Sequence, residues 1–89
     1  MKAIFQTSQF KKDFKRIKKQ GKDLSKLKED VSAMANSEVR KKRHRDHALS
    51  GILAGSRDCH IEPDWILIYR IDEDFLFLER TGSHSDLFR

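Results

Sequence analysis

The sequence predicts an α+β fold in which an N-terminal helical hairpin packs on a mainly antiparallel sheet. Three observations lead to this fold class. In the first half of the chain, apolar residues recur every three or four positions, which is the period of an amphipathic helix. In the second half they follow strand-like patterns between short polar turns. The 89 residues suffice for one core of two layers, so residues 1–89 are expected to form a single domain.

A short strand and a first helix are expected at the N-terminus. Residues 2–7 form the strand, and Ser8 follows as the expected N-cap of the helix. The apolar residues on one face of this helix have spacings of four and three: Phe10, Phe14 and Ile17. Lysine and arginine occupy its other faces, and those in the last turn suit the negative end of the helix dipole. Gly21 ends the helix.

A second helix is expected to begin near Asp23 or Ser25. Its apolar residues recur at spacings of three, four and three: Leu24, Leu27, Val31 and Met34. The tight turn at Gly21 joins the two helices into a hairpin. Because each helix has a single apolar stripe, both are expected to lie on the same sheet.

Three strands are expected in the second half of the chain. Residues 56–61 form the first strand, and the proline-containing stretch 62–64 forms a turn. Residues 65–71 are apolar on both faces, which is typical of a central strand. After a second turn at 72–74, residues 75–81 form the last strand, and a polar tail follows. The predicted order of elements is therefore β-α-α-β-β-β.

Residues 37–50 contain a continuous basic run at 40–45 and lack apolar periodicity, so an exposed basic loop is expected there. Residues 1–49 hold 15 Lys and Arg against 6 Asp and Glu, whereas residues 50–89 hold 4 against 8. The whole chain carries a formal net charge of +5. The basic first half indicates a polyanionic partner, and charge alone leaves RNA, DNA and an acidic protein open.

The cysteine content and the lack of long apolar runs favour the cytoplasm. Cys59 is the only cysteine, so no intrachain disulfide can form. The N-terminus lacks the pattern of a signal peptide, and no segment approaches the roughly 20 apolar residues of a membrane-spanning helix. We therefore expect a cytoplasmic protein that does not associate with a membrane.

Two histidines and an aspartate are expected to meet at one end of the sheet. His60 lies near the end of the first strand of the meander, Asp64 lies in the following turn, and His84 lies just beyond the last strand. In an antiparallel meander that turn and the end of the last strand lie at the same end of the sheet. Alternation along the strand puts Asp58 on the face of His60, toward solvent or the site, and Cys59 on the core face.

These residues favour metal-free RNA cleavage, so no metal or other cofactor is expected. His44 and His47 are three positions apart, but the spacing to the other histidines fits no closed zinc site. No serine lies on a strained elbow, and Cys59 faces inward, which disfavours nucleophilic catalysis. RNA carries its own nucleophile, the 2′-OH, and its cleavage needs a base, an acid and cations on the phosphate. Histidine suits both proton transfers because its ordinary pKa lies near neutrality.

Aromatic and basic residues supply the expected RNA contacts. Trp65, at the start of the central strand, and Phe88, in the C-terminal tail, can stack on exposed bases. A position in the core is the equally weighted alternative for Trp65. The cations of the basic loop that are expected to contact the substrate are Lys41, Lys42, Arg43 and Arg45. His44, within the same run, is expected to contribute only charge.

Three stretches of the second half closely resemble YafQ-type toxins of the RelE/ParE superfamily. They are residues 45–51, 57–69 and 79–88, in the same order and with similar spacing. The resemblance implies the toxin of a type II toxin–antitoxin pair with a RelE-like fold. It implies an endoribonuclease that enters the ribosomal A site and cuts mRNA there. It also implies a cognate antitoxin protein that wraps and inhibits the toxin, in a complex that commonly represses its own operon by binding operator DNA.

The same resemblance implies which residues function. Its catalytic positions fall on His47, His60, Asp64, His84 and Phe88. Asp58 and Trp65 match neighbouring motif positions and are expected to contact the substrate. The sequence departs from the pattern at Ala48, where relatives often have proline, and this puts the rigidity of the loop that carries His47 in doubt.

The expected roles follow the chemistry of RNA cleavage. Either His60 or Asp64 acts as the general base on the 2′-OH, and His84 acts as the general acid on the leaving 5′-oxygen. His47 and Arg80 stabilise charge on the phosphate, and Phe88 packs on or orients a base. The geometry of the second half suggests Arg80, which the resemblance does not single out.

Two other functions remain open from the sequence. A ParE-like inhibitor of a DNA topoisomerase would share the fold and would not need the histidines. A non-catalytic nucleic-acid-binding module would use the basic first half and leave RNA intact. Loss of function on removing the histidines distinguishes the ribonuclease from both.

Overall fold

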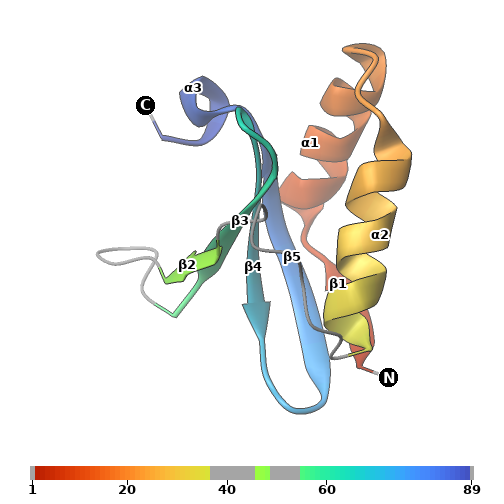
Figure 1. Cartoon of the computed structure of the whole chain (residues 1–89), viewed down its shortest axis with the longest axis vertical. Helices are drawn as coiled ribbons and strands as arrows, with labels where there is room; N and C mark the ends of the chain where they lie inside the picture. The colour runs from red at the N-terminus through yellow and green to blue at the C-terminus, as the bar shows by residue number, and fades with distance from the viewer. Residues whose placement is uncertain (1, 37–45, 49–54, 89) are drawn as a thin grey trace.

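The structure, a computed structural model, describes residues 2–36, 46–48 and 55–88, with residues 46–48 described by their backbone (Figure 1). The elements follow the order β1 (Ala3–Gln6), α1 (Ser8–Lys19), α2 (Leu24–Ala35), β2 (Asp46–Ala48), β3 (Arg57–Glu62), β4 (Trp65–Ile71), β5 (Phe75–Gly82) and α3 (His84–Leu87). The predicted α+β class and the helical hairpin are confirmed. Within the described ranges, no helix is both long and apolar enough to cross a membrane.

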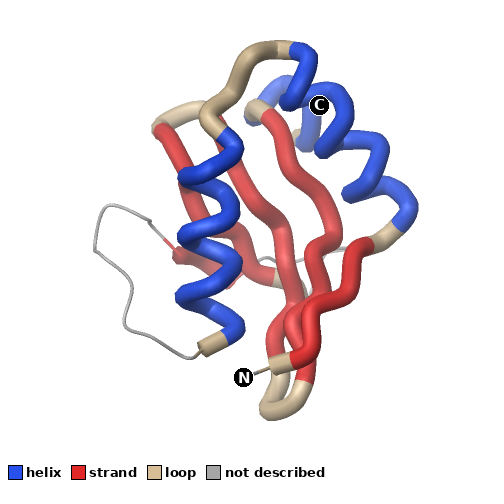
Figure 2. Tube along the Cα trace, turned by 90° about the vertical axis from the view of Figure 1, so that its right-hand side faces the viewer, coloured by secondary structure: helices blue, strands red, loops and turns tan. Residues whose placement is uncertain are grey.

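The strands form one sheet in the order β1-β5-β4-β3-β2. The β5–β4, β4–β3 and β3–β2 pairs are antiparallel, whereas β1 runs parallel to β5 at one edge. Both long helices lie on the same face of this sheet (Figures 1 and 2). At the other edge of the sheet, β2 pairs with β3, and α3 follows directly after β5.

Side-chain caps start both long helices. Thr7 caps α1, because its Oγ1 accepts a hydrogen bond from the backbone N–H of Phe10 at 3.0 Å. The predicted cap, Ser8, is instead the first residue of the helix. Asp23 caps α2 by accepting from the backbone N–H of Ser25 at 3.1 Å, and the helix begins near Asp23, one of the two predicted starts. Gly21, at φ +78°, adopts the left-handed conformation that the turn between the helices requires.

The core lies between the two long helices and the sheet. Its buried members are Phe10 and Ile17 from α1, Leu27, Met34 and Ala35 from α2, Cys59 and Ile61 from β3, Trp65, Leu67 and Tyr69 from β4, and Leu76 and Leu78 from β5. The predicted stripes of both helices supply these contacts. Burying one such aliphatic side chain stabilises the fold by roughly 1.5–3 kcal/mol. Packing in the core therefore holds the strands of the sheet in place, and two histidines lie at one end of these strands.

Two short elements differ from the prediction. Residues 46–48, expected in an exposed loop, form β2, which pairs with β3. The C-terminal stretch, expected as a polar tail without an assigned element, forms the helical turn α3. Elements of three and four residues are too short to show a period, and both depend on contacts with the rest of the chain. The basic stretch 37–45 lies outside the described residues.

Candidate active site

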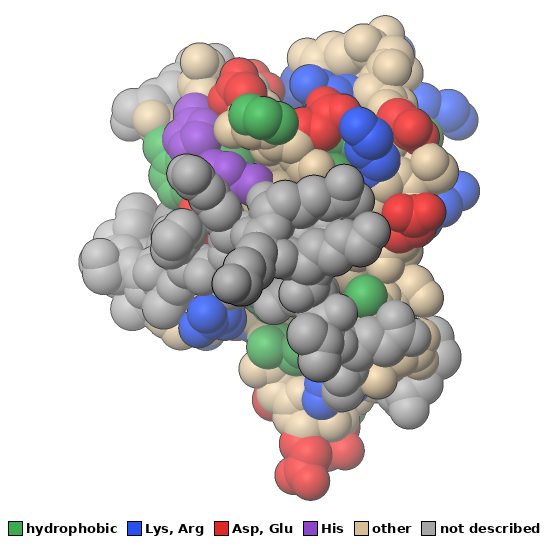
Figure 3. Space-filling model, viewed as in Figure 1, with side chains coloured by type: hydrophobic (Ala, Val, Ile, Leu, Met, Phe, Trp, Pro, Cys, Tyr) green, Lys and Arg blue, Asp and Glu red, His purple; other side chains and the backbone are tan. Residues whose placement is uncertain are grey.

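His60, Asp64 and His84 lie together at one end of the sheet, as the strand order predicted. His60 comes from β3, Asp64 from the β3–β4 turn, and His84 is the first residue of α3. The ring centroids of His60 and His84 are 5.6 Å apart and the rings are nearly perpendicular, at 83°. We call these two residues the histidine pair. Figure 3 shows a patch of histidine side chains on the molecular surface. The side chain of His84 is 54% exposed, whereas His60 is partly buried.

Asp64 holds His84 through two contacts to a single carboxylate oxygen. Asp64 Oδ1 accepts a hydrogen bond from the backbone N–H of His84 at 3.0 Å and lies 3.2 Å from the ring Nδ1. The backbone hydrogen bond, followed by the contact with the ring, lowers the pKa of Asp64 below its ordinary value. Asp64 is therefore a carboxylate at neutral pH and orients the imidazole of His84.

Phe88 extends this site at the end of α3. Its ring centroid lies 5.9 Å from that of His84, and its backbone N–H donates to the His84 carbonyl at 2.8 Å. The side chain is 39% exposed. An exposed aromatic ring beside the histidine pair can stack on a nucleotide base.

The strand β2 brings residue 47 next to β3. The backbone register pairs His47 with Asp58, two positions before His60. Asp58 was expected to face solvent or the site; its side chain is 8% exposed, so it does not face solvent. Its Oδ1 has no hydrogen-bond partner within the described part of the chain. Asp58 thus offers a buried acceptor beside the site, and its contact with substrate stays a prediction, as does the role of His47.

Trp65 does not contribute to this surface. Its side chain is 0% exposed, and its Nε1–H donates to Thr81 Oγ1 at 2.9 Å. The expectation that Trp65 stacks on a base is therefore wrong, because its ring is part of the core. The sequence left both interpretations open, since an aromatic residue at a strand end can face either the core or solvent.

A register shift explains the position of Arg80. Ile68 pairs with Arg80 while the next residue, Tyr69, pairs with Leu78, so Glu79 is an extra residue in β5. Such a bulge changes the direction of nearby side chains. Simple alternation along the strand was therefore a poor guide to this side chain.

The guanidinium of Arg80 binds a buried aspartate of α1. Arg80 Nε donates to Asp13 Oδ2 at 2.7 Å, and the side chain of Asp13 is 0% exposed. The structure does not place Arg80 against the histidine pair, and its phosphate contact stays a prediction. The sequence analysis overlooked Asp13. Its position three residues after Phe10 and four before Ile17, on the apolar face of α1, was the signal for its burial.

The basic loop and Cys59 complete the comparison with the sequence. The cations of the basic loop, namely Lys41, Lys42, Arg43 and Arg45, lie outside the described residues. Cys59 is buried in the core, as predicted. In the ranges that the structure covers, no three His, Cys, Asp or Glu side chains are grouped so as to hold a metal ion.

Comparisons with known proteins agree with this geometry. A family model described as the bacterial toxin of type II toxin–antitoxin system, YafQ, matches residues 2–89. The mRNA interferase toxin YafQ of Escherichia coli strain K12 is 42% identical over 83 residues, which are 92% of this chain and 90% of that protein. The crystal structure of YafQ from E. coli strain BL21(DE3) has a TM-score of 0.93 and 39% identity over 100% of both chains.

A further similar structure contains a partner protein. In the crystal structure of the E. coli DinJ–YafQ toxin–antitoxin complex, the matching chain has a TM-score of 0.90 and 40% identity. The match covers 99% of this chain and 98% of that one. Sequence, fold and the family model thus agree over nearly the whole chain, which belongs to the YafQ family of bacterial toxins from type II toxin–antitoxin systems.

Proposed function

We propose that this protein, an endoribonuclease of the YafQ family, cuts mRNA in the ribosomal A site by metal-free acid–base catalysis. The observation that carries the proposal is the histidine pair, with ring centroids 5.6 Å apart and one ring tied to a carboxylate. Two imidazoles at this separation, that of His84 exposed and that of His60 partly exposed, can lie on either side of a single phosphodiester. RNA needs only two proton transfers to be cleaved, and each contributes roughly 10²–10⁴-fold to the rate.

His60 is the better candidate for the general base. The lowered pKa of Asp64 makes its carboxylate a weak acceptor for the proton of a 2′-OH near neutral pH. Asp64 is also occupied by His84, at 3.0 and 3.2 Å. In this mechanism His60 removes the 2′-OH proton, and the 2′-oxygen attacks phosphorus.

His84 completes the reaction as the general acid. Its Nδ1 contacts Asp64, so Nε2 is the atom left to give a proton to the departing 5′-oxygen. The bond between phosphorus and the 5′-oxygen breaks as that proton is transferred. The products are a 2′,3′-cyclic phosphate and a 5′-hydroxyl end. Phe88 stacks on a base, and His47 and Arg80 stabilise charge on the phosphate.

The same proposal includes the partners of the toxin. An antitoxin protein binds and inhibits it, and the complex binds operator DNA through the antitoxin. The DinJ–YafQ complex of the similar E. coli chain supports the antitoxin. The excess of Lys and Arg in residues 1–49 supports binding to ribosomal and messenger RNA, and we place this activity in the cytoplasm.

The test compares the wild type with His60→Ala and His84→Ala on ribosomes programmed with a short mRNA, with and without EDTA. Both variants are expected to lose roughly 10²–10⁴-fold in cleavage rate while remaining folded. Glu73→Ala, in the β4–β5 turn away from the histidine pair, is the matched surface control. Naked RNA in parallel measures the dependence on the ribosome.

The chemistry of the product ends distinguishes the mechanisms. Cyclic or 3′-phosphate ends that form in EDTA support the proposal. Ends with a 3′-hydroxyl, or inactivation by EDTA, would contradict metal-free catalysis. Toxicity that survives the loss of both histidines would instead favour a topoisomerase inhibitor.

A further inference from the structure

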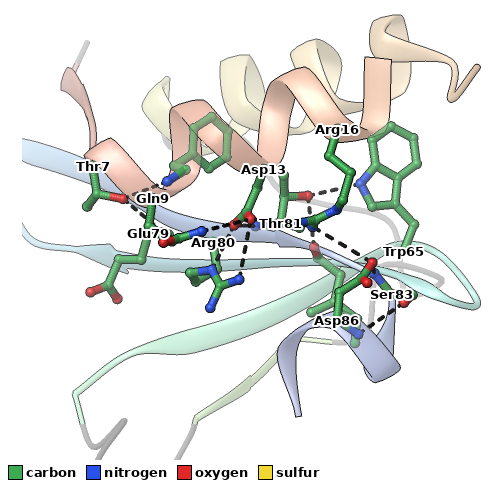
Figure 4. A network of polar contacts seen from close by, with 12 residues as sticks. Thr7, Gln9, Asp13, Arg16, Trp65, Glu79, Arg80, Thr81, Ser83 and Asp86 are labelled. Atoms are coloured by element: carbon green, nitrogen blue, oxygen red, sulfur yellow. Dashed lines mark hydrogen bonds and ion pairs between the residues drawn. The ribbon is translucent and has the colours of Figure 1, made fainter. Parts of the chain in front are cut away.

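A buried carboxylate connects α1 to the end of β5. Asp13 Oδ1 accepts from Arg16 Nη1 at 2.9 Å, and Asp13 Oδ2 accepts from Arg80 Nε at 2.7 Å and from the backbone N–H of Thr81 at 3.2 Å. Figure 4 shows the two guanidinium groups converging on this carboxylate between helix and strand. Two charge-assisted partners and a backbone donor hold Asp13 in one orientation.

Arg16 carries this connection on to α3. Its Nη1 binds Asp13, while its Nη2 donates to the Thr81 carbonyl at 2.9 Å and lies 3.7 Å from Asp86 Oδ2. Asp86 also forms the capping box of α3, in which its Oδ2 accepts from the backbone N–H of Ser83 at 3.2 Å. One planar guanidinium thus contacts helix α1, strand β5 and the first turn of α3.

The backbone at Gly82 is shaped around this guanidinium. A Cβ at position 82 would lie 2.5 Å from Arg16 Nη2 and 3.1 Å from Asp86 Oδ2. The φ of Gly82, +155°, is also one that other residues rarely adopt. Only glycine leaves room for Arg16 at the junction between β5 and α3.

The helix α3 depends on such contacts because it has no core of its own. It has four residues, and none of them is buried. A helix this short does not form in isolation. Polar contacts hold it on two sides, from Arg16 to Asp86 and from Asp64 to His84. The position of the His84 imidazole therefore depends on a residue of α1 that lies outside the site.

We infer that Arg16 is a positioning residue for the reaction proposed above: bound by Asp13, its guanidinium fixes the β5–α3 junction and so holds His84 against His60. Arg16 needs no contact with RNA for this role. The inference rests on the proposed function, because it concerns the general acid of that reaction.

The decisive experiment varies the leaving group. Short mRNAs are synthesised with either the natural 5′-oxygen or a bridging 5′-sulfur at the cleaved linkage. A thiolate leaves without being protonated, so a defect in the general acid disappears on the sulfur substrate. A defect in folding or in RNA binding persists on both.

Arg16→Lys keeps the positive charge but loses the planar fork that contacts Asp13 and Thr81 together. We expect its kcat to fall about 10–100-fold on the oxygen substrate and at most about 3-fold on the sulfur substrate, with little change in KM. Asp86→Asn, which retains an oxygen acceptor for the capping box, is a second variant with a smaller loss of the same pattern. Thermal unfolding of each variant confirms that it is folded.

Two further variants complete the design. Arg70→Lys removes the guanidinium of another ion pair, with Glu79 at 3.3 Å, away from α3, and its kcat should equal that of the wild type. His84→Ala is the reference for a defect in the general acid, because its loss of kcat should also be smaller on the sulfur substrate than on the oxygen substrate.

The outcomes separate the inference from the function on which it rests. A wild type that cleaves neither substrate, or a His84→Ala loss of equal size on both, overturns the proposed reaction. A second outcome has the wild type and His84→Ala behaving as expected while Arg16→Lys is equally impaired on both substrates or unimpaired on both. That outcome overturns only the positioning role of Arg16.

Discussion

Asp13 and Asp64 both flank the end of β5, both have a lowered pKa and both bind a cationic or potentially cationic side chain, yet their environments are opposite. The side chain of Asp13 is 0% exposed, whereas that of Asp64 is 69% exposed. Asp13 orders the scaffold, because it joins α1 to β5 through arginines. Asp64 hydrogen-bonds the first residue of α3, and its side chain is open to water. Exposure thus separates a carboxylate that holds the fold from one that orients the proposed general acid.

The largest effect that we expect from this comparison is on rate. Asp64→Asn should slow cleavage about 10²-fold, because an amide no longer favours the tautomer of His84 that donates from Nδ1. The free energy of unfolding should stay close to that of the wild type, since the group is exposed. Single-turnover cleavage and urea denaturation measure the two quantities. An unchanged rate would show that His84 needs no carboxylate.

Asp13→Asn should reverse this pattern and act mainly on stability. Removing one partner of a buried ion pair costs about 3–5 kcal/mol. We expect about 2–3 kcal/mol here, because the side chains of Arg16 and Arg80 are 34% and 32% exposed and water compensates part of the loss. Urea denaturation at pH 7 provides the measurement. A loss below about 0.5 kcal/mol would mean that this carboxylate does not anchor the fold.

The pH dependence of stability sharpens the same contrast. Burial alone would raise the pKa of Asp13, but the hydrogen bonds from Arg80, Thr81 and Gln9 outweigh it and lower the pKa below 3.8. The stabilisation is therefore complete above the unfolded value of 3.8 and is lost as the pH falls through the lower folded value.

Between about pH 5 and pH 2, the free energy of unfolding should therefore fall more for the wild type than for Asp13→Asn. Urea denaturation at several pH values across this range measures the difference. The difference between the two proteins isolates Asp13 from other acidic groups. Parallel pH curves would place the stabilising charge elsewhere.

The smallest expected effect concerns the buried side of β5. Trp65→Phe keeps an aromatic ring in the core but removes the donor to Thr81 Oγ1, which itself donates to the Ile66 carbonyl at 2.9 Å. The loss should be about 1 kcal/mol in stability, with an unchanged KM for RNA. A raised KM would restore a role for Trp65 in substrate binding.

Much of the fold followed from periodicity in the sequence. The stripes of α1 and α2 and the meander of β3, β4 and β5 were predicted, and the strand order alone brought His60, Asp64 and His84 to one end of the sheet. These features depend on repeated spacing and on topology, which a single sequence contains. The sequence predicted a loop where β2 forms and did not predict α3. Such short elements form only through pairing and capping by distant residues.

The errors at the site have a common physical origin. Trp65 was left open between the core and RNA, because residue type does not reveal on which side of a strand end a ring packs. The bulge at Glu79 displaced Arg80 from the simple alternation of a strand, and Asp13 was overlooked within a lysine-rich helix. The positions of Trp65 and Asp13 depend on contacts between residues more than 15 positions apart, Trp65 with Thr81 and Asp13 with Arg80. The bulge depends on how β5 pairs with β4. Composition and spacing do not encode such contacts.

The absence of buried residues in α3 has a genetic consequence. A selection for cells that survive expression of this toxin should recover two kinds of mutant. Most substitutions in the core would give misfolded, degraded protein, whereas those at residues 82–88 would give soluble and harmless protein. Loss of toxicity and loss of folding are then separable by sequencing only the survivors that still accumulate the protein. Such variants would also allow the chain to be produced in quantity without a protective partner.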